Sequence, residues 1–382
     1  MTDVSDLERF ADRAAATGDL AAARRSLEQA VEQGPASLDL WTKLSAIRRA
    51  QGDLEGALAA IERALALSPL DFSALLARAI LLERAGDPRA SEAYANAVAR
   101  LPPDKDVPEA MRNAVDRARE KAARHQQSIE ERLLDAIPGD LSDQQRRRLE
   151  RFASNTSRRT RHFHQEPTNF HYPGLPEIEF HDPGRFPGLA EIERATEAIR
   201  AEYEALIKLK TTELVPYTQY PDHVPLAQWR ELNNNPDWTA IHLLQNGQRV
   251  EANAGQCPKT MELLAKLPQP DMPGAAPNAM FSLLAPRTRI PPHTGVANVR
   301  LVAHLPLIVP LGCGFRVGET FREWRVGEAF VFDDTIEHEA WNDSDELRVV
   351  LIFDLWAPDI DLAERSAVAK LIGAAGVSFK GG

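Results

Sequence analysis

The chain has 382 residues, a length that favours two domains over one. Hydrophobic residues make up 43% and charged residues 26%, as in ordinary globular proteins, and the net charge of −11 argues against nucleic acid as a partner. Two cysteines do not suggest a disulfide framework, and the acidic start and the lack of a long apolar run predict a cytoplasmic protein without a membrane span.

The first hundred residues repeat with a period of 34, marked by Gly18, Gly52 and Gly86. Between these glycines lie Ala-rich segments with helical apolar spacing. The pattern resembles tetratricopeptide repeats. In the middle unit the matching residues are Trp41, Leu44, Gly52, Ala57, Ile61, Ala64 and Pro69. We therefore expect helical repeats over residues 1–103, with a degenerate third unit in which Ser91 replaces a packing alanine.

Residues 104–165 are charged and predicted to form a helical linker. Seven arginines crowd its second half, at positions 146, 147, 148, 151, 158, 159 and 161. A nucleic-acid arm and a solvated linker both fit this composition, and we favour the linker. His162 and His164 have the spacing of metal ligands, but no further Cys/His cluster supports that role, so we expect surface residues.

From Asn169 onward the composition of the chain changes. Pro and Gly become frequent, and after residue 276 short segments alternate apolar residues with other residues, as in 300–309 and 347–356. Period-2 segments bounded by turns are typical of β-sandwiches and barrels. We expect a β domain over residues 166–382.

Three residues in this β region suggest a chemistry. Two neutral imidazoles, from His293 and His338, suit iron(II) with open positions left on the metal. Arg348 follows ten residues after His338 on the next predicted strand, where a guanidinium offers a fixed fork for a carboxylate.

The surroundings of these residues resemble the catalytic domain of the aspartate/asparagine (aspartyl/asparaginyl) β-hydroxylase family. The likeness covers roughly residues 166–360. It is carried by Tyr172-Pro-Gly-Leu-Pro176, Cys257-Pro258, Phe281-Ser282, Pro292-His293-Thr-Gly295, Asn298-Val-Arg300, His304-Leu305, Val309-Pro310, Gly312-Cys313, Phe332-Asp-Asp334, Glu337-His338-Glu339, Trp341, Arg348 and Asp354. It implies a double-stranded β-helix, a jelly roll of the cupin type. It also implies the cofactor Fe(II) and the cosubstrates 2-oxoglutarate and O2, with succinate and CO2 released.

The resemblance also assigns roles to single residues. His293 and His338 match the iron ligands. Arg348 and Ser282 match the pair that holds the distal carboxylate of 2-oxoglutarate, and His304 matches the group at its other carboxylate. Arg300 matches a basic residue near the substrate, although a strand-facing arginine can also pair with an acid such as Asp354.

Two positions bear on the subtype. Peptide-hydroxylating members carry a second arginine where this chain has Val302. Most 2-oxoglutarate oxygenases have a carboxylate two residues after the first histidine, and this chain has Gly295 there, as the resembled family does. Water is expected as the third ligand. We expect Asp333 and Asp334 to be turn residues or acceptors for an imidazole N–H.

The leading hypothesis is a dioxygenase that hydroxylates an unactivated C–H bond, at the β-carbon of an aspartyl or asparaginyl residue or in a related amino-acid-like substrate. A non-enzymatic repeat scaffold, a halogenase with chloride in the open metal position, and a lipid-acyl hydroxylase are the alternatives. The repeats either bind a protein partner or pack against their own chain. Whether the substrate is a protein, a peptide or a small molecule stays open.

Overall fold

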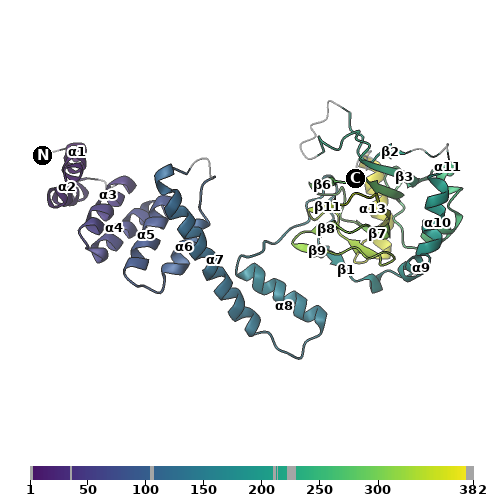
Figure 1. The fold of residues 1–382 in the computed structure, drawn as a ribbon, viewed down its shortest axis with the longest axis horizontal. Coiled ribbons are helices and arrows are strands. Elements are labelled where there is room, and N and C mark those ends of the chain that lie inside the picture. The colour runs from purple at the N-terminus through teal and green to yellow at the C-terminus, as the bar shows by residue number, and fades with distance from the viewer. Residues whose placement is uncertain are drawn as a thin grey trace. The chain divides into compact units, whose positions relative to one another are not determined.

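The computed structural model describes residues 3–34, 37–103, 107–209, 212, 214–221 and 229–375. The chain divides into two compact units, Met1–Arg161 and His162–Gly382 (Figure 1). Most of the expected linker, residues 104–165, therefore groups with the repeats, because α7 packs against α6. Residues 104–106 lie outside the described part.

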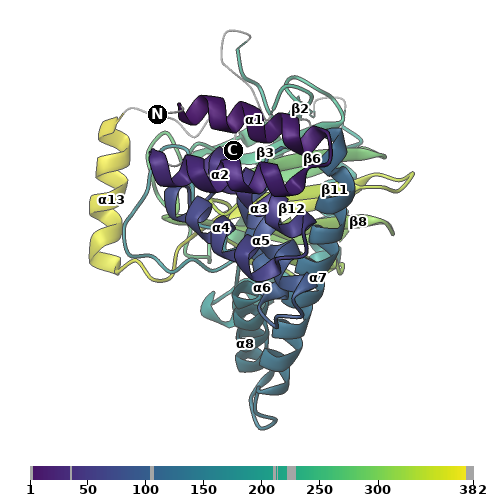
Figure 2. The same cartoon turned by 90° about the vertical axis from the view of Figure 1, so that its left-hand side faces the viewer.

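The first unit consists of stacked helix pairs in chain order (Figure 2). Gly18 and Gly52 adopt positive φ angles of 84° and 82° in the turn of the first two pairs, a conformation that favours glycine. Asp19 and Asp53 follow and cap the next helix with their side chains. The helices are α1 Val4–Ala16, α2 Leu20–Gln33, α3 Leu38–Ala50, α4 Leu54–Leu67, α5 Phe72–Arg84 and α6 Ala90–Val98. The expected tetratricopeptide-type repeats are confirmed.

The third pair differs from its predicted register. Asp87 caps a turn by accepting a hydrogen bond from the backbone N–H of Arg89, so α6 begins only at Ala90. Ala93 consequently takes the buried packing position, whereas Ser91 is exposed. The expectation that Ser91 replaces the packing alanine was wrong, since the later helix start shifts the register. After α6 come η2 Glu109–Met111, α7 Arg112–Asp135 and α8 Asp143–Thr156.

The second unit contains two antiparallel sheets. The larger has the order β1-β10-β7-β12-β5-β3-β2, with β4 on β3, and the smaller has the order β6-β11-β8-β9. The larger sheet contains β1 Phe180–His181, β2 Val215–Pro216, β3 Trp238–Gln245, β4 Gln248–Arg249, β5 Ala279–Leu284, β7 Arg300–Ile308, β10 Phe330–Phe332 and β12 Arg348–Trp356. The smaller contains β6 Thr288–His293, β8 Cys313–Val317, β9 Thr320–Arg322 and β11 His338–Asn342. From β5 to β12 the chain passes back and forth between the sheets, which is the expected double-stranded β-helix.

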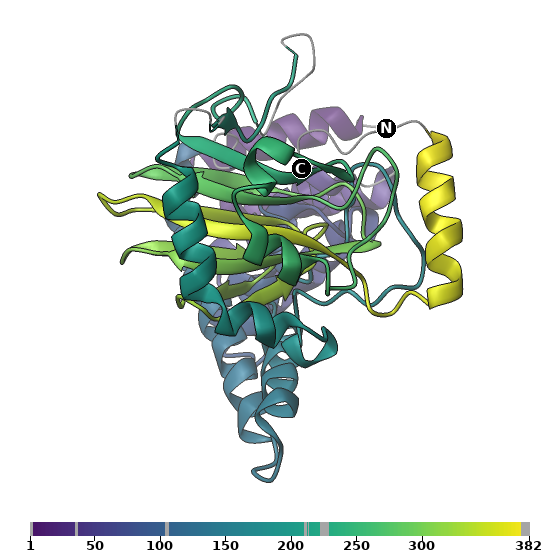
Figure 3. The ribbon, with the colours of Figure 1, turned by 90° about the vertical axis from the view of Figure 1, so that its right-hand side faces the viewer.

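Alternation along the strands separates two cores. On β12, Val349, Leu351 and Phe353 pack with the helices that cover the outer face of the larger sheet (Figure 3). The residues between them, such as Val350 and Ile352, face the smaller sheet.

The helices of this unit are η3 Pro183–Arg185, α9 Leu189–Arg194, α10 Thr196–Leu206, α11 Glu251–Ala254, α12 Pro258–Leu264 and α13 Leu362–Ala375. Among the described residues, none of the helices is long and apolar enough to cross a membrane.

Among the described residues, the cores of the second unit draw only on those from Phe163 onward. We therefore predict that a chain shortened to residues 157–382 folds by itself. Its thermal unfolding, followed by near-UV circular dichroism, should be cooperative and lie within about 4 °C of the β-domain transition of the full chain. An insoluble product or a broad, non-cooperative melt would show that the repeats complete this fold.

Candidate functional site

A pocket opens between the inner faces of the two sheets. The larger sheet contributes side chains from β5, β7 and β12, and the smaller sheet contributes His293, His338 and their neighbours. All six site residues expected from the sequence line this pocket: Ser282, His293, Arg300, His304, His338 and Arg348. Residues from segments 66 positions apart, such as Ser282 and Arg348, are thus brought together by the fold.

His293 and His338 lie opposite each other where β6 pairs with β11. Their ring centroids are 4.0 Å apart. His293 Nδ1 lies 2.8 Å from the carbonyl oxygen of Pro291, and His338 Nδ1 lies 3.1 Å from that of Ile336. Because a carbonyl only accepts, each Nδ1 is the N–H donor, and each Nε2 keeps its lone pair.

The histidine pair is held in its neutral form. Burial lowers the pKa of His293 to about 4 and lowers that of His338 far below its usual value. Two adjacent imidazoles that are neutral, fixed in tautomer by the backbone and free at Nε2 fit the ligand pair of a divalent transition metal.

Arg348 is buried beside this pair, at 1% exposure. Its Nη2 donates to the Ser282 hydroxyl oxygen at 3.3 Å, and the Trp238 indole N–H donates to the same oxygen at 3.1 Å. The guanidinium carbon lies 5.4 Å from the Trp324 ring centroid. Burial lowers the pKa of Arg348 to about 10, which leaves it protonated at neutral pH. Among the described residues, no carboxylate pairs with it and its Nε has no hydrogen-bond partner.

His304 lies on β7, within the same buried region. Burial, and then the neighbouring Arg348, lower its pKa far below the usual value, so the ring is neutral. Trp324 stacks parallel to it, with centroids 5.8 Å apart. In the part of the chain that the structure describes, His304 Nδ1 is buried without a hydrogen-bond partner. Buried polar atoms in this state are costly unless a ligand satisfies them.

Arg300 is held between two acids. Its Nη1 donates to Asp354 at 2.7 Å and its Nη2 donates to Asp334 at 2.8 Å, with all three side chains buried. Burial disfavours the charge of Arg300, but the two carboxylates raise its pKa overall. Asp354 also accepts from the backbone N–H and the side chain of Asn278. Arg300 lines the pocket as expected, yet its positive charge is already neutralised by its own chain.

Asp334 fills the space beside Gly295. A Cβ at position 295 would overlap the Asp334 carboxylate, and the Gly295 N–H donates to the Asp334 carbonyl. Asp333 accepts from the backbone N–H and hydroxyl of Thr335, so it is a turn residue as expected. The alternative role of these acids, as imidazole acceptors, was wrong for Nδ1, because backbone carbonyls already occupy both of those nitrogens.

Aromatic residues on the remaining wall were not identified from the sequence. Tyr217 stacks on Trp238 with centroids 3.9 Å apart, and Trp229 lies 4.5 Å from the His293 ring. Tyr217 and Trp229 belong to irregular segments, where no spacing rule marks the pocket side, and Trp238 begins β3.

Comparison with known proteins agrees with this architecture. The family model of aspartyl/asparaginyl β-hydroxylases matches residues 193–358. The family model of tetratricopeptide repeats matches residues 9–71 and 47–106. An ornithine lipid ester-linked acyl 2-hydroxylase of Rhizobium tropici is 35% identical over 196 residues, which cover 50% of this chain and 66% of that protein. Human aspartyl/asparaginyl β-hydroxylase is 34% identical over 148 residues, covering 38% of this chain and 19% of that protein.

A third relative is human aspartate β-hydroxylase domain-containing protein 2. It is 32% identical over 210 residues, which cover 53% of this chain and 54% of that protein. The chain therefore spans between about a fifth and two thirds of the length of these three relatives. The family match at residues 193–358 lies in the β domain and includes the six expected site residues.

The contact between Gly295 and Asp334 can be tested by stability alone. Gly295→Ala should lower the free energy of unfolding by about 1–3 kcal/mol, because the new methyl group overlaps a packed carboxylate. Asp334→Ala should destabilise by about 3–5 kcal/mol, because it breaks a buried ion pair. The double variant should cost less than the two together, by at least about 0.5 kcal/mol in denaturant titrations.

Gly373→Ala is the matched control, since a Cβ there meets open space. It should leave stability unchanged or raise it slightly. Strict additivity of Gly295→Ala and Asp334→Ala would contradict the contact.

Proposed function

The C-terminal domain of this chain belongs to the aspartyl/asparaginyl β-hydroxylase family, and from this premise we propose that the chain is an iron(II)- and 2-oxoglutarate-dependent dioxygenase that hydroxylates an unactivated C–H bond. The observation that carries the proposal is a buried, unpaired Arg348 beside two neutral histidines. A protonated arginine without an acid is costly in a protein interior. A dicarboxylate that also reaches a metal on the histidines would offset that cost.

In this proposal His293 and His338 hold iron through Nε2. When bound, iron(II) supplies the oxidising chemistry with O2, and the oxidation of 2-oxoglutarate to succinate and CO2 balances the hydroxylation. The chain orients the two rings through the carbonyls of Pro291 and Ile336. The Trp229 indole, whose centroid lies 4.5 Å from that of the His293 ring, would cover one side of that ring.

Arg348 and Ser282 form the proposed seat of the distal carboxylate. The guanidinium offers two parallel donors, and the Ser282 hydroxyl, which accepts from Trp238, is left with a proton to donate. His304 supplies a neutral ring with a buried, unsatisfied Nδ1 for the other end of 2-oxoglutarate.

The substrate stays a choice between two classes. The family description supports the β-carbon of an aspartyl or asparaginyl residue, or a related amino-acid-like substrate. One observation favours a lipid acyl chain as the second candidate: Arg300 is neutralised by Asp334 and Asp354, so no cation of that strand is left for an acidic substrate. The relative from Rhizobium tropici carries the name of an acyl hydroxylase. Mass spectrometry for a gain of one oxygen, with Asp- and Asn-containing peptides and acyl lipids offered in parallel, decides between the classes.

The repeats are proposed to bind a protein partner or a large substrate. Stacked helix pairs of this kind expose extended surfaces that commonly bind peptides. The rate of hydroxylation of a large substrate should be measured for the full chain and for residues 157–382. The difference between the two rates gives the contribution of the repeats.

The metal assignment predicts that both histidines are required. His293→Ala and His338→Ala should each abolish 2-oxoglutarate decarboxylation, measured as succinate release, because one imidazole and waters hold iron weakly. His171→Ala, at an exposed histidine of the same unit, should keep wild-type turnover. Full turnover in either pocket variant would rule out this ligand pair.

The cosubstrate assignment predicts a separate defect at Arg348. Each charge-assisted contact is worth roughly 1.5–3 kcal/mol, so Arg348→Ala should weaken 2-oxoglutarate binding at least about tenfold. Arg348→Lys keeps a charge but loses the fork, and should be impaired less. Anaerobic titration at saturating iron, read from the visible band of the iron–cosubstrate complex, measures this affinity. Wild-type affinity in Arg348→Ala would show that another residue holds the carboxylate.

A further inference from the structure

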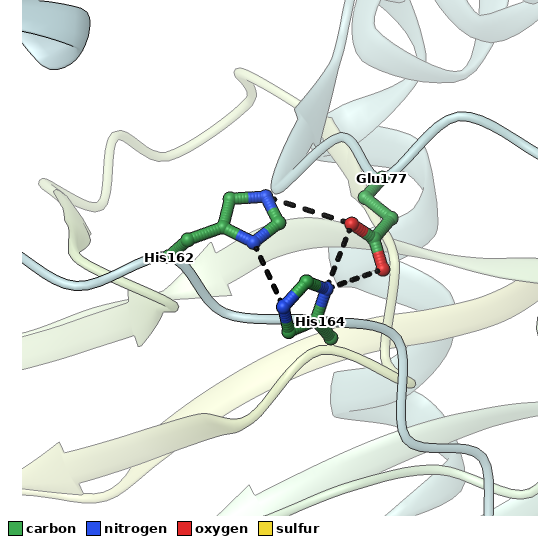
Figure 4. A group of neighbouring side chains, drawn as sticks. All are labelled: His162, His164 and Glu177. Atoms are coloured by element: carbon green, nitrogen blue, oxygen red, sulfur yellow. Dashed lines mark hydrogen bonds and ion pairs between the residues drawn. The ribbon is translucent and has the colours of Figure 1, made fainter. Parts of the chain in front are cut away.

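A second group of metal-binding side chains lies at the start of the β unit, outside the pocket. His162, His164 and Glu177 turn toward one another on the surface (Figure 4). Each residue offers one ligand atom, and these three atoms all lie within 4.8 Å of one another. Glu177 Oε2 is 3.5 Å from His162 Nε2 and 3.2 Å from His164 Nδ1. The acid that completes the group comes from a loop 13 residues after His164.

We propose that these three residues bind a divalent transition-metal ion of the Zn²⁺ type, with water as the fourth ligand. Ligand atoms of a tetrahedral zinc site, at bond lengths of about 2.1 Å, are roughly 3.4 Å apart. The two distances from the Glu177 carboxylate fall on either side of that value. Two imidazoles and one carboxylate suit zinc better than calcium or magnesium, which prefer oxygen ligands alone.

The side chains are accessible to a metal from solution. His162 and His164 expose 52% and 67% of their side chains, and Glu177 exposes 30%. Glu177 is also held in place, because its Oε1 accepts a 3.0 Å hydrogen bond from the backbone N–H of Gln165. Nδ1 of His162 and Nε2 of His164 face each other at 3.3 Å, so zinc binding would need rotation of these imidazoles toward a carboxylate that is already oriented.

The segment that carries this site is tied to the loop before His338. Gln165 forms a β-bridge with Ile336, and its side chain donates to Asp333 and accepts from Asn298. The backbone N–H of Glu166 donates to the Thr335 carbonyl at 2.8 Å. A metal that fastens His162 and His164 to Glu177 thus restrains the segment that packs on residues 333–336. The role that follows is structural: the bound ion steadies the loop that precedes β11, at whose start the pocket histidine His338 lies.

The test uses the full chain with both pocket histidines replaced, His293→Ala with His338→Ala, so that only the surface site remains. Zn²⁺ titration by calorimetry should give one ion per chain. His162→Ala, His164→Ala and Glu177→Gln should each weaken zinc binding more than about tenfold, since losing a ligand costs at least as much as losing one of its supporting groups. His171→Ala, a neighbouring exposed histidine, should leave zinc binding unchanged.

The same titration on the chain with an intact pocket guards against misfolding of the double variant. There zinc should occupy two sites, and His164→Ala should remove one of them. Zinc should also slow amide exchange of residues 333–336 in the double variant, an effect that His164→Ala should abolish. Absence of a bound ion, or zinc binding that survives all three substitutions, would leave the group a hydrogen-bonded surface cluster and overturn the proposal. Unchanged exchange at 333–336 would overturn the structural role.

Discussion

The organisation of the β unit depends on the strict alternation of β7 and β12 in the larger sheet. Each of these strands buries one row of apolar residues under helices and turns the other row toward the smaller sheet. The inner row can therefore hold charged residues only if they satisfy one another or a ligand. Arg300 and Asp354 satisfy one another, whereas Arg348 has no carboxylate partner among the described residues.

This contrast divides the pocket into two electrostatic regions. At the Arg300 end the charges of the arginine and its two acids are paired within the chain. At the Arg348 end a positive charge and a neutral His304 lie among aromatic rings. The histidine pair lies on the facing sheet and lines the same pocket as both regions. In the proposed reaction a dicarboxylate would bind at the Arg348 end, and the Arg300 end would face the substrate.

Much of this could be predicted from the sequence, because it follows fixed periods. The repeat of 34 fixed the turns at Gly18 and Gly52, and the period of two placed Arg348 on the pocket face. What failed depended on contacts between distant segments. Ser91 lost its expected place because a turn at Asp87 delayed the helix. The pairing of Arg300 with Asp354 was one of the sequence-based alternatives, but the contact from Asp334, 34 positions away, was not. Glu177, in an irregular loop, carries no periodic mark at all.

The trio of Arg300, Asp334 and Asp354 has an evolutionary consequence. The guanidinium is already aimed into the cavity, and only two carboxylates keep it from attracting an anion. Exchange of both acids for neutral residues would leave the guanidinium as a preformed anion seat in the same sheet framework. The charge at this end of the pocket can thus change through substitutions at two positions, while the histidine pair and Arg348 stay in place. A change of this kind is easily reversed, because the backbone geometry that it needs is present in both forms.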